Sequence, residues 1–314
     1  MNKSTPSILA DTPYTSGVDI QLPELLNYKQ HGKLSLDIKR FPASRQLSGN
    51  YLANIKGRGM EFAEVRHYQA GDDVRSIDWA VTARTGKTHT KLFQEEKERP
   101  VFILLDISDS MIFGSQLVFK SVQACHLAAL LSWQAKQRND RLGGIVFNQQ
   151  EAAELKPTSR SKGLMAFLHQ SQMLCKPVAY KQEQAKQSLL LQLKRLSHLV
   201  QTGSQVHLIS DFSQLDEACY KLINLIRRHN QVSVWQITDP LESHLPKHLL
   251  QSSLKINSLT ESGFLRSKKQ QASYQDAASK RQQLMEKNML KYGIAHYHLS
   301  TAIPLLEQFN AHAK

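Results

Sequence analysis

Apolar runs of strand length alternate with longer segments of helical periodicity from Pro100 onward. A continuous apolar run such as 101–107 (VFILLDI) is typical of a strand that is covered on both faces. Segments such as 117–136 and 186–200 instead repeat apolar residues at helical spacing. This alternation predicts an α/β fold, a mostly parallel sheet with helices on both faces. We expect strands over 101–107, 141–148, 206–212, 232–238 and 294–300, and helices over 117–136, 163–174, 186–200, 216–228 and 273–291.

The N-terminal third of the chain has a different pattern. Residues up to about 20 are polar and are expected to form a mobile tail. The segment 22–32 predicts a short helix, because a proline lies in its first turn and a glycine at its end. Between 33 and 99, short β-branched and aromatic stretches are separated by glycines. We therefore predict three parts: a tail and short helix over 1–32, a β-rich extension over 33–99, and an α/β domain over 100–314.

Composition supports a globular protein and argues against a membrane-spanning one. Of 314 residues, 41% are hydrophobic and 21% charged, which is ordinary for a chain with a sizeable core. No apolar run approaches the roughly 20 residues that a membrane-spanning helix needs, and the N-terminus lacks the apolar core of a signal peptide. The three cysteines are widely spaced, which favours reduced core thiols over disulfides or a zinc site. We expect a cytoplasmic protein.

The basic charge leaves a second class of function open. A net charge of +13 and a pI near 9.6 favour anionic partners. No dense Lys/Arg tract, zinc-finger spacing or RNA-recognition aromatic signature accompanies that charge. Nucleic-acid binding is therefore kept as the alternative function.

Oxygen-bearing side chains follow two of the predicted strands. Asp106, Ser108 and Ser110 come directly after one buried strand, and Asp211 ends another. Because ligands bind beyond the carboxyl ends of strands in open α/β sheets, we expect these residues to meet. Hard oxygen ligands suit Mg²⁺ or Mn²⁺ and not zinc or copper. The competing interpretation is that the two serines cap the following helix.

The pattern DISDS before a helix, with SDF after a later strand, resembles the metal-ion-dependent adhesion site of von Willebrand factor A domains. The resemblance implies that Asp106, Ser108, Ser110 and Asp211 hold the ion, and that a carboxylate of a partner protein fills the open position. It also implies a threonine ligand from another loop, for which Thr158 is the candidate, with Ser159 and Ser161 as alternatives.

A longer segment is similar to one bacterial branch of these proteins. Residues 57–100, which run directly into the DISDS motif, resemble the signature of the domain of unknown function 58 family. The matching residues are Gly71, Asp72, Asp73, Val74, Arg75, Ile77, Asp78, Trp79, Ala83 and Arg84. The resemblance implies a von Willebrand factor A-like fold and a partner that is a MoxR-type AAA+ ATPase. Acidic and basic residues alternate around Trp79, and we interpret them as a network that fixes the β-rich extension onto the sheet, with direct contact to a partner as the alternative.

Catalytic interpretations find less support in the residues. The GKT at 86–88 lacks the preceding P-loop glycine and is followed by a strand-like segment. A phosphoaspartyl hydrolase would need a second carboxylate two residues after Asp106, where Ser108 lies. We therefore predict a non-enzymatic, Mg²⁺- or Mn²⁺-dependent protein-binding module, an accessory of a MoxR-type ATPase in assembly or maturation of other proteins. A metal-dependent hydrolase is the third possibility.

Overall fold

A computed structural model of the chain describes residues 13–32, 60–69, 71–95, 98–176, 187–243, 254–257, 262–265 and 268–310. The chain divides into two compact units. The larger unit joins the N-terminal residues to everything from Arg99 onward, and the smaller one spans Gln46–Glu98. Residues 33–59 of the predicted β-rich extension lie outside the described residues.

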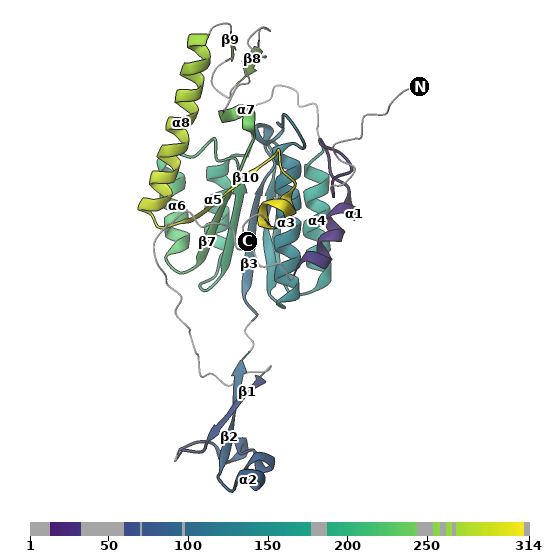
Figure 1. Cartoon of the computed structure of the whole chain (residues 1–314), viewed down its shortest axis with the longest axis vertical. Helices are drawn as coiled ribbons and strands as arrows, with labels where there is room; N and C mark the ends of the chain where they lie inside the picture. The colour runs from purple at the N-terminus through teal and green to yellow at the C-terminus, as the bar shows by residue number, and fades with distance from the viewer. Residues whose placement is uncertain are drawn as a thin grey trace. The chain divides into compact units, whose positions relative to one another are not determined.

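A six-stranded sheet forms the centre of the larger unit, in the order β10-β7-β6-β3-β4-β5 (Figure 1). Neighbouring strands run parallel except β4 and β5, which pair antiparallel. The predicted mostly parallel sheet is therefore confirmed. Its strands are β3 (Pro100–Asp106), β4 (Arg141–Phe147), β5 (Ala152–Thr158), β6 (Gln205–Ser210), β7 (Gln231–Thr238) and β10 (Ala295–Ser300).

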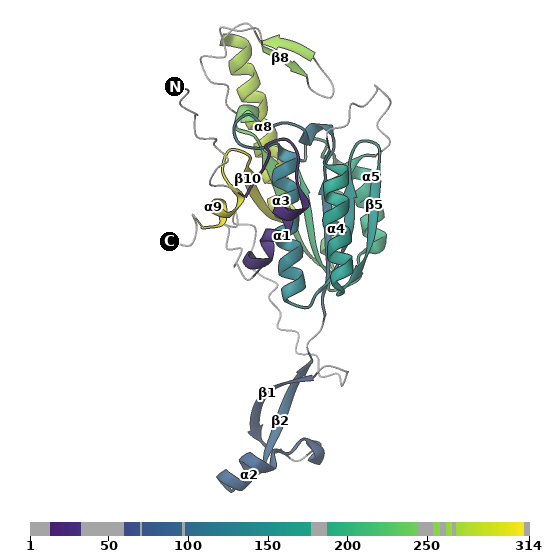
Figure 2. The same ribbon diagram turned by 90° about the vertical axis from the view of Figure 1, so that its right-hand side faces the viewer.

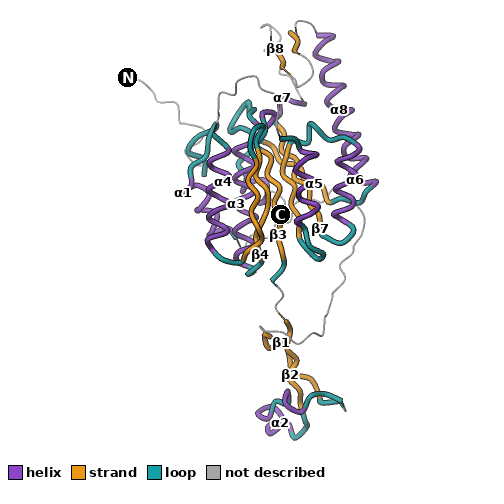
Figure 3. The backbone as a smooth tube through the Cα atoms, turned by 180° about the vertical axis from the view of Figure 1, so that it is seen from behind, coloured by secondary structure: helices purple, strands orange, loops and turns teal. Residues whose placement is uncertain are grey.

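Helices cover both faces of this sheet, with α1, α3 and α4 on one side of the strands and α5, α6 and α8 on the other (Figure 3). The side chains of β3 alternate between two cores: Ile103 packs on the α3 and α4 side, and Leu104 on the α5 and α6 side. Figure 2 shows α3 and α4 side by side. The helices are α1 (Leu22–Asn27), α3 (Lys120–Gln137), α4 (Ser161–Leu174), α5 (Leu189–Leu199), α6 (Glu217–Arg227), α7 (Pro240–Ser243), α8 (Lys268–Lys291) and α9 (Leu305–Asn310). Short 3-10 helices η1 (Tyr28–His31) and η3 (Asp109–Met111) and a hairpin of β8 (Leu254–Asn257) and β9 (Ser262–Leu265) complete the unit.

The described N-terminal residues are part of the sheet unit. Tyr14 and Ile20 are 3% and 2% exposed and belong to the same core cluster as residues of β3 and α3. The Trp133 indole N–H donates to the Leu25 carbonyl at 3.0 Å, which fastens α1 to α3. The mobile tail predicted up to about residue 20 is therefore wrong for residues 13–20, because their apolar side chains complete the core.

The smaller unit contains an antiparallel hairpin and a helix that the sequence pattern did not predict. Asp78 begins this helix by accepting hydrogen bonds from two backbone N–H groups of its first turn, and Gly86 ends it in the left-handed conformation. Arg66 and Asp72 form an ion pair of 2.7 Å, and Trp79 is 68% exposed. These contacts are internal to the unit, so the role of the network in fixing it to the sheet stays a prediction. The elements are β1 (Met60–His67), η2 (Val74–Ser76), α2 (Trp79–Thr85) and β2 (His89–Glu95).

Candidate metal-binding site

The carboxyl ends of β3 and β6 bring two predicted site residues together. The strands are parallel neighbours in which Leu105 pairs with Ile209, so Asp106 lies beside Ser210. Asp211 is the next residue, so it also lies at the carboxyl ends of the parallel strands. The two carboxylates were predicted to meet because parallel strands end at one edge, and the structure brings both to that edge.

Asp106 is buried and held by neutral donors. Its Oδ1 accepts the Ser108 backbone N–H at 2.9 Å, and its Oδ2 accepts the Ser210 hydroxyl at 2.6 Å. Burial, and next the charge of Asp211, raise the pKa of Asp106 to about 6. A cation beside Asp106 would relieve both effects, because each disfavours the charged carboxylate.

Ser108 and Ser110 lie next to Asp106 in the loop that follows β3. Their Oγ atoms are 3.4 Å apart, and Ser108 is 4% exposed. Helix α3 begins well beyond them, at Lys120, and Ser108 makes no side-chain capping bond to η3. The alternative that these serines cap a helix is therefore not supported, and their hydroxyl oxygens remain as candidate ligands. Asp109, between them, is exposed.

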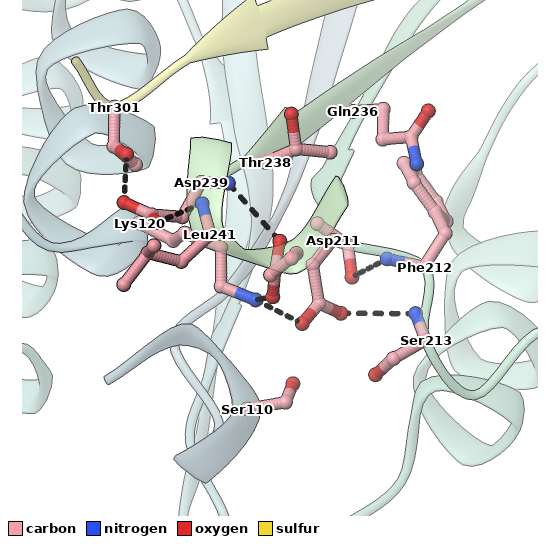
Figure 4. Close-up of polar contacts among 12 residues, drawn as sticks. Ser110, Lys120, Asp211, Phe212, Ser213, Gln236, Thr238, Asp239, Leu241 and Thr301 are labelled. Carbon is pink, nitrogen blue, oxygen red and sulfur yellow. Dashed lines mark hydrogen bonds and ion pairs between the residues drawn. The ribbon is translucent and has the colours of Figure 1, made fainter. Parts of the chain in front are cut away.

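Asp211 pairs with a buried lysine that was not among the predicted site residues. The Lys120 Nζ lies 2.8 Å from Asp211 Oδ2 and 2.5 Å from Glu242 Oε1. Figure 4 shows the ammonium beside Asp211, with the Ser110 hydroxyl directed toward the same carboxylate. Burial acts to raise the pKa of Asp211, but the Lys120 ammonium and the hydrogen bonds from Ser213 together hold that pKa below its usual range. A lone lysine at the start of an apolar helix was the available signal, since lysine is almost never fully buried unless paired.

A strained turn fixes the direction of Asp211. Phe212 has φ 56°, a left-handed conformation that costs a bulky residue about 1–2 kcal/mol. Two hydrogen bonds of 3.0 Å hold this turn: the Phe212 N–H donates to Ser210 Oγ, and the Ser213 N–H donates to Asp211 Oδ1 (Figure 4). The strain is maintained where the backbone aims a carboxylate, as is common at functional sites.

Asp239 ties the surrounding loops together. It accepts the Ser115 hydroxyl and the Thr301 hydroxyl, each at 2.6 Å, and so links the loop before α3 to the ends of β7 and β10. Its backbone N–H donates to Glu242 Oε2 at 3.0 Å. Through this contact, the turn of α7 holds the Glu242 carboxylate against Lys120.

Thr158 does not join the site. It pairs with Leu142, the second residue of β4, whereas Asp106 pairs with Phe147 at the other end of that strand. Five steps along the strand separate these two residues, about 17 Å at roughly 3.3 Å per step. Because β5 runs antiparallel, its last residue, Thr158, lies beside the N-terminal ends of the parallel strands, opposite to the site. The predicted alternatives Ser159 and Ser161 follow it there.

The assembled donors are two carboxylates and two hydroxyls. In the described part of the chain, no group of three or more His, Cys, Asp or Glu side chains could hold a metal ion. A cation at this edge would therefore depend on serine oxygens together with Asp106. Such a hard and incomplete donor set fits Mg²⁺, which retains several waters when bound, better than it fits a softer metal.

The structure is that of a mixed α/β protein. Its mostly parallel sheet carries a polar site at the carboxyl ends of its central strands. Residues 64–280 match the family described as protein of unknown function DUF58, and the chain belongs to it. Uncharacterized proteins of Mycobacterium bovis and Mycobacterium tuberculosis are each 30% identical over 202 residues, covering 64% of this chain and 62% of the relative. The chain thus spans less than two thirds of their length.

Solved structures similar to the chain include BatB from Bacteroides thetaiotaomicron, with a TM-score of 0.41 and 17% identity over 68% of this chain and 96% of that one. An aerotolerance-related membrane protein from Bacteroides fragilis has a TM-score of 0.40 and 18% identity over 68% and 95%. Among the described residues of this chain, no helix has the length and apolarity needed to cross a membrane.

Proposed function

We propose that the chain is a non-enzymatic protein-binding module that engages its partner through Mg²⁺ or Mn²⁺ at the strand-end site. The observation that carries the proposal is the convergence of Asp106, Ser108 and Ser110, with Asp211 at the adjoining strand end. Three of these four residues are 9% exposed or less, so a bound ion would be shielded on the protein side. This arrangement supports the likeness to the von Willebrand factor A adhesion site that the sequence suggested.

Asp106, Ser108 and Ser110 are the residues that would hold the ion. A bound divalent ion supplies a concentrated positive charge that accepts a carboxylate from another protein. The excess negative charge at Asp106 favours a cation there, because burial and the Asp211 charge both act against the lone carboxylate. In this proposal Asp211 contributes charge, directly or through water, and Thr158 contributes nothing.

We further propose that the partner is a MoxR-type AAA+ ATPase or its client, and that the module serves the assembly or maturation of other proteins in the cytoplasm. This partner follows from the family's signature in residues 57–100. The three cysteines, all free and buried, support a reducing compartment.

The experiment compares the recovery of the MoxR-type ATPase on the full chain with and without EDTA. Asp106→Asn keeps the shape of the side chain and removes its charge, and Asp109→Asn is the matched control, because Asp109 lies in the same loop but is exposed. We expect EDTA and Asp106→Asn each to reduce recovery at least tenfold, and Asp109→Asn to leave it unchanged. Equal recovery in all four conditions would refute metal-dependent binding.

A further inference from the structure

The first residue of α3 is a buried cation inside the candidate site. The Lys120 side chain is 2% exposed, and its partner Asp211 is 6% exposed. Its Nζ lies within 2.8 Å of Asp211 and 2.5 Å of Glu242, which is the position of a counter-ion between two carboxylates. Lysine is rarely buried to this degree, so the ammonium is kept here by these two partners.

The two strand-end carboxylates are compensated differently. Asp211 has the Lys120 ammonium, whereas Asp106 has the Ser108 N–H and the Ser210 hydroxyl, which are neutral donors. No basic side chain among the described residues pairs with Asp106. Among the described residues, Lys120 is thus one basic partner for two buried carboxylates, and a cation drawn to Asp106 would also be attracted by Asp211.

We propose that Lys120 is an exchangeable internal counter-ion, which competes with a divalent cation for Asp211. This inference rests on the proposed metal-dependent function and adds the residue that sets the affinity of the site for its ion. Without a divalent ion, Lys120 neutralises Asp211 and keeps the site folded. A divalent ion at the site would repel the ammonium, which would lose its contact with Asp211 and keep the one with Glu242.

Glu242 already contacts Lys120 and would remain its partner after the exchange. Its side chain is 35% exposed, so this end of the triad reaches solvent. Its other carboxylate oxygen, Oε2, is fixed by the Asp239 N–H in the turn of α7. An ammonium released from Asp211 would still have a carboxylate partner. Because Glu242 lies in α7, the exchange would change the contacts of that helix.

Binding of Mn²⁺ to the full chain tests the competition. Lys120→Met removes the charge and keeps the length and the apolar stem. Lys136→Met is the control on the same helix, because Lys136 donates to the Ser159 carbonyl at the opposite edge of the sheet. Free Mn²⁺ is measured by electron paramagnetic resonance, and the melting temperature is measured in EDTA and in excess Mn²⁺.

We expect Lys120→Met to bind Mn²⁺ at least tenfold more tightly than wild type, and Lys136→Met to bind like wild type. We also expect Lys120→Met to melt at a lower temperature in EDTA and to recover most of the loss in Mn²⁺. If wild type binds Mn²⁺ and Lys120→Met binds it equally or more weakly, the competition is refuted and the proposed function stands. If neither protein binds Mn²⁺, the proposed function fails as well.

A measurement on wild type tests the same exchange without relying on the folding of a variant. The ammonium signal of Lys120, observed by nitrogen-detected nuclear magnetic resonance of lysine-labelled protein, should shift when Mg²⁺ saturates the site. The signal of Lys136 serves as the internal control and should not shift. A Lys120 signal that is unchanged by Mg²⁺, in protein that calorimetry shows to be loaded, would overturn the inference.

Discussion

We predict that the buried ion pair between Lys120 and Asp211 stabilises the protein in metal-free buffer. Lys120→Met leaves the buried Asp211 carboxylate without its cation, and Asp211→Asn leaves the ammonium with Glu242 alone. The double variant contains neither charge. We expect each single variant to be clearly destabilised and the double variant to be less destabilised than the sum of the two.

The size of the expected loss in free energy of unfolding follows from the burial of the two charges. At 2% and 6% exposure, neither charge can be solvated when its partner is removed. Breaking a buried pair in this way costs about 3–5 kcal/mol of the free energy of unfolding. For Asp211→Asn, the loss in free energy of unfolding should be about 3 kcal/mol or less, because Glu242 remains as a partner of Lys120. The 35% exposure of Glu242 weakens that remaining contact. The coupling between the two substitutions should be about 2 kcal/mol or more.

Urea unfolding in EDTA measures these free energies, with the fluorescence of the buried Trp235 reporting on the sheet. The control is Glu217→Gln, which removes an exposed pair with Lys221 and should leave the midpoint unchanged. Additive single substitutions, or single variants within about 1 kcal/mol of wild type, would show that the pair is not a coupled buried unit.

Three further predictions concern other contacts. Ser210→Ala removes the 2.6 Å hydrogen bond to Asp106 and should lower the free energy of unfolding by about 1–3 kcal/mol in urea; a value near zero would show that water replaces the hydroxyl. Burial lowers the pKa of His207 to about 3, whereas unfolded histidine titrates near 6.5, so the unfolded state takes up the proton first. The contribution of His207 to stability should be fully present above about pH 6.5 and lost as the pH falls toward 3. His207→Gln should therefore reduce the loss of stability in melting curves over this range, and an equal loss in both proteins would contradict the prediction. A Cβ at Gly144 would overlap the backbone oxygen of Ile103, so Gly144→Ala should lower stability by about 1–3 kcal/mol, and an unchanged melting temperature would contradict this close approach.

The amino-acid sequence alone was enough to predict a mostly parallel α/β sheet and the four oxygen donors at its strand ends. Continuous apolar runs separated by helical segments specify buried parallel strands, because the period of a strand and of a helix can be recognised locally. Asp106 and Asp211 were predictable as neighbours for the same reason: each directly ends such a run, and parallel strands end at one edge. Ser108 and Ser110 follow from Asp106 by short-range spacing.

The location of Thr158 was decided by the direction of one strand. In a strictly parallel alternation, the loop before a helix lies at the carboxyl ends of the strands, where a ligand to the ion would be needed. The short connection between β4 and β5 allows only antiparallel pairing, since a parallel crossover needs about a dozen residues or more. The short connection is visible in the sequence, but β5 was not predicted as a strand. It contains Pro157, which is typical of an outermost strand.

Only the tertiary structure could show what compensates the charge at the site. Lys120, Asp211 and Glu242 come from α3, the end of β6 and α7, and 91 residues separate the lysine from its aspartate. Periodicity places Lys120 on a helix and Asp211 at the end of a strand, but it does not say how far a long side chain reaches or which charge it meets. Burial then makes that meeting obligatory, because an ammonium removed from water must have a partner.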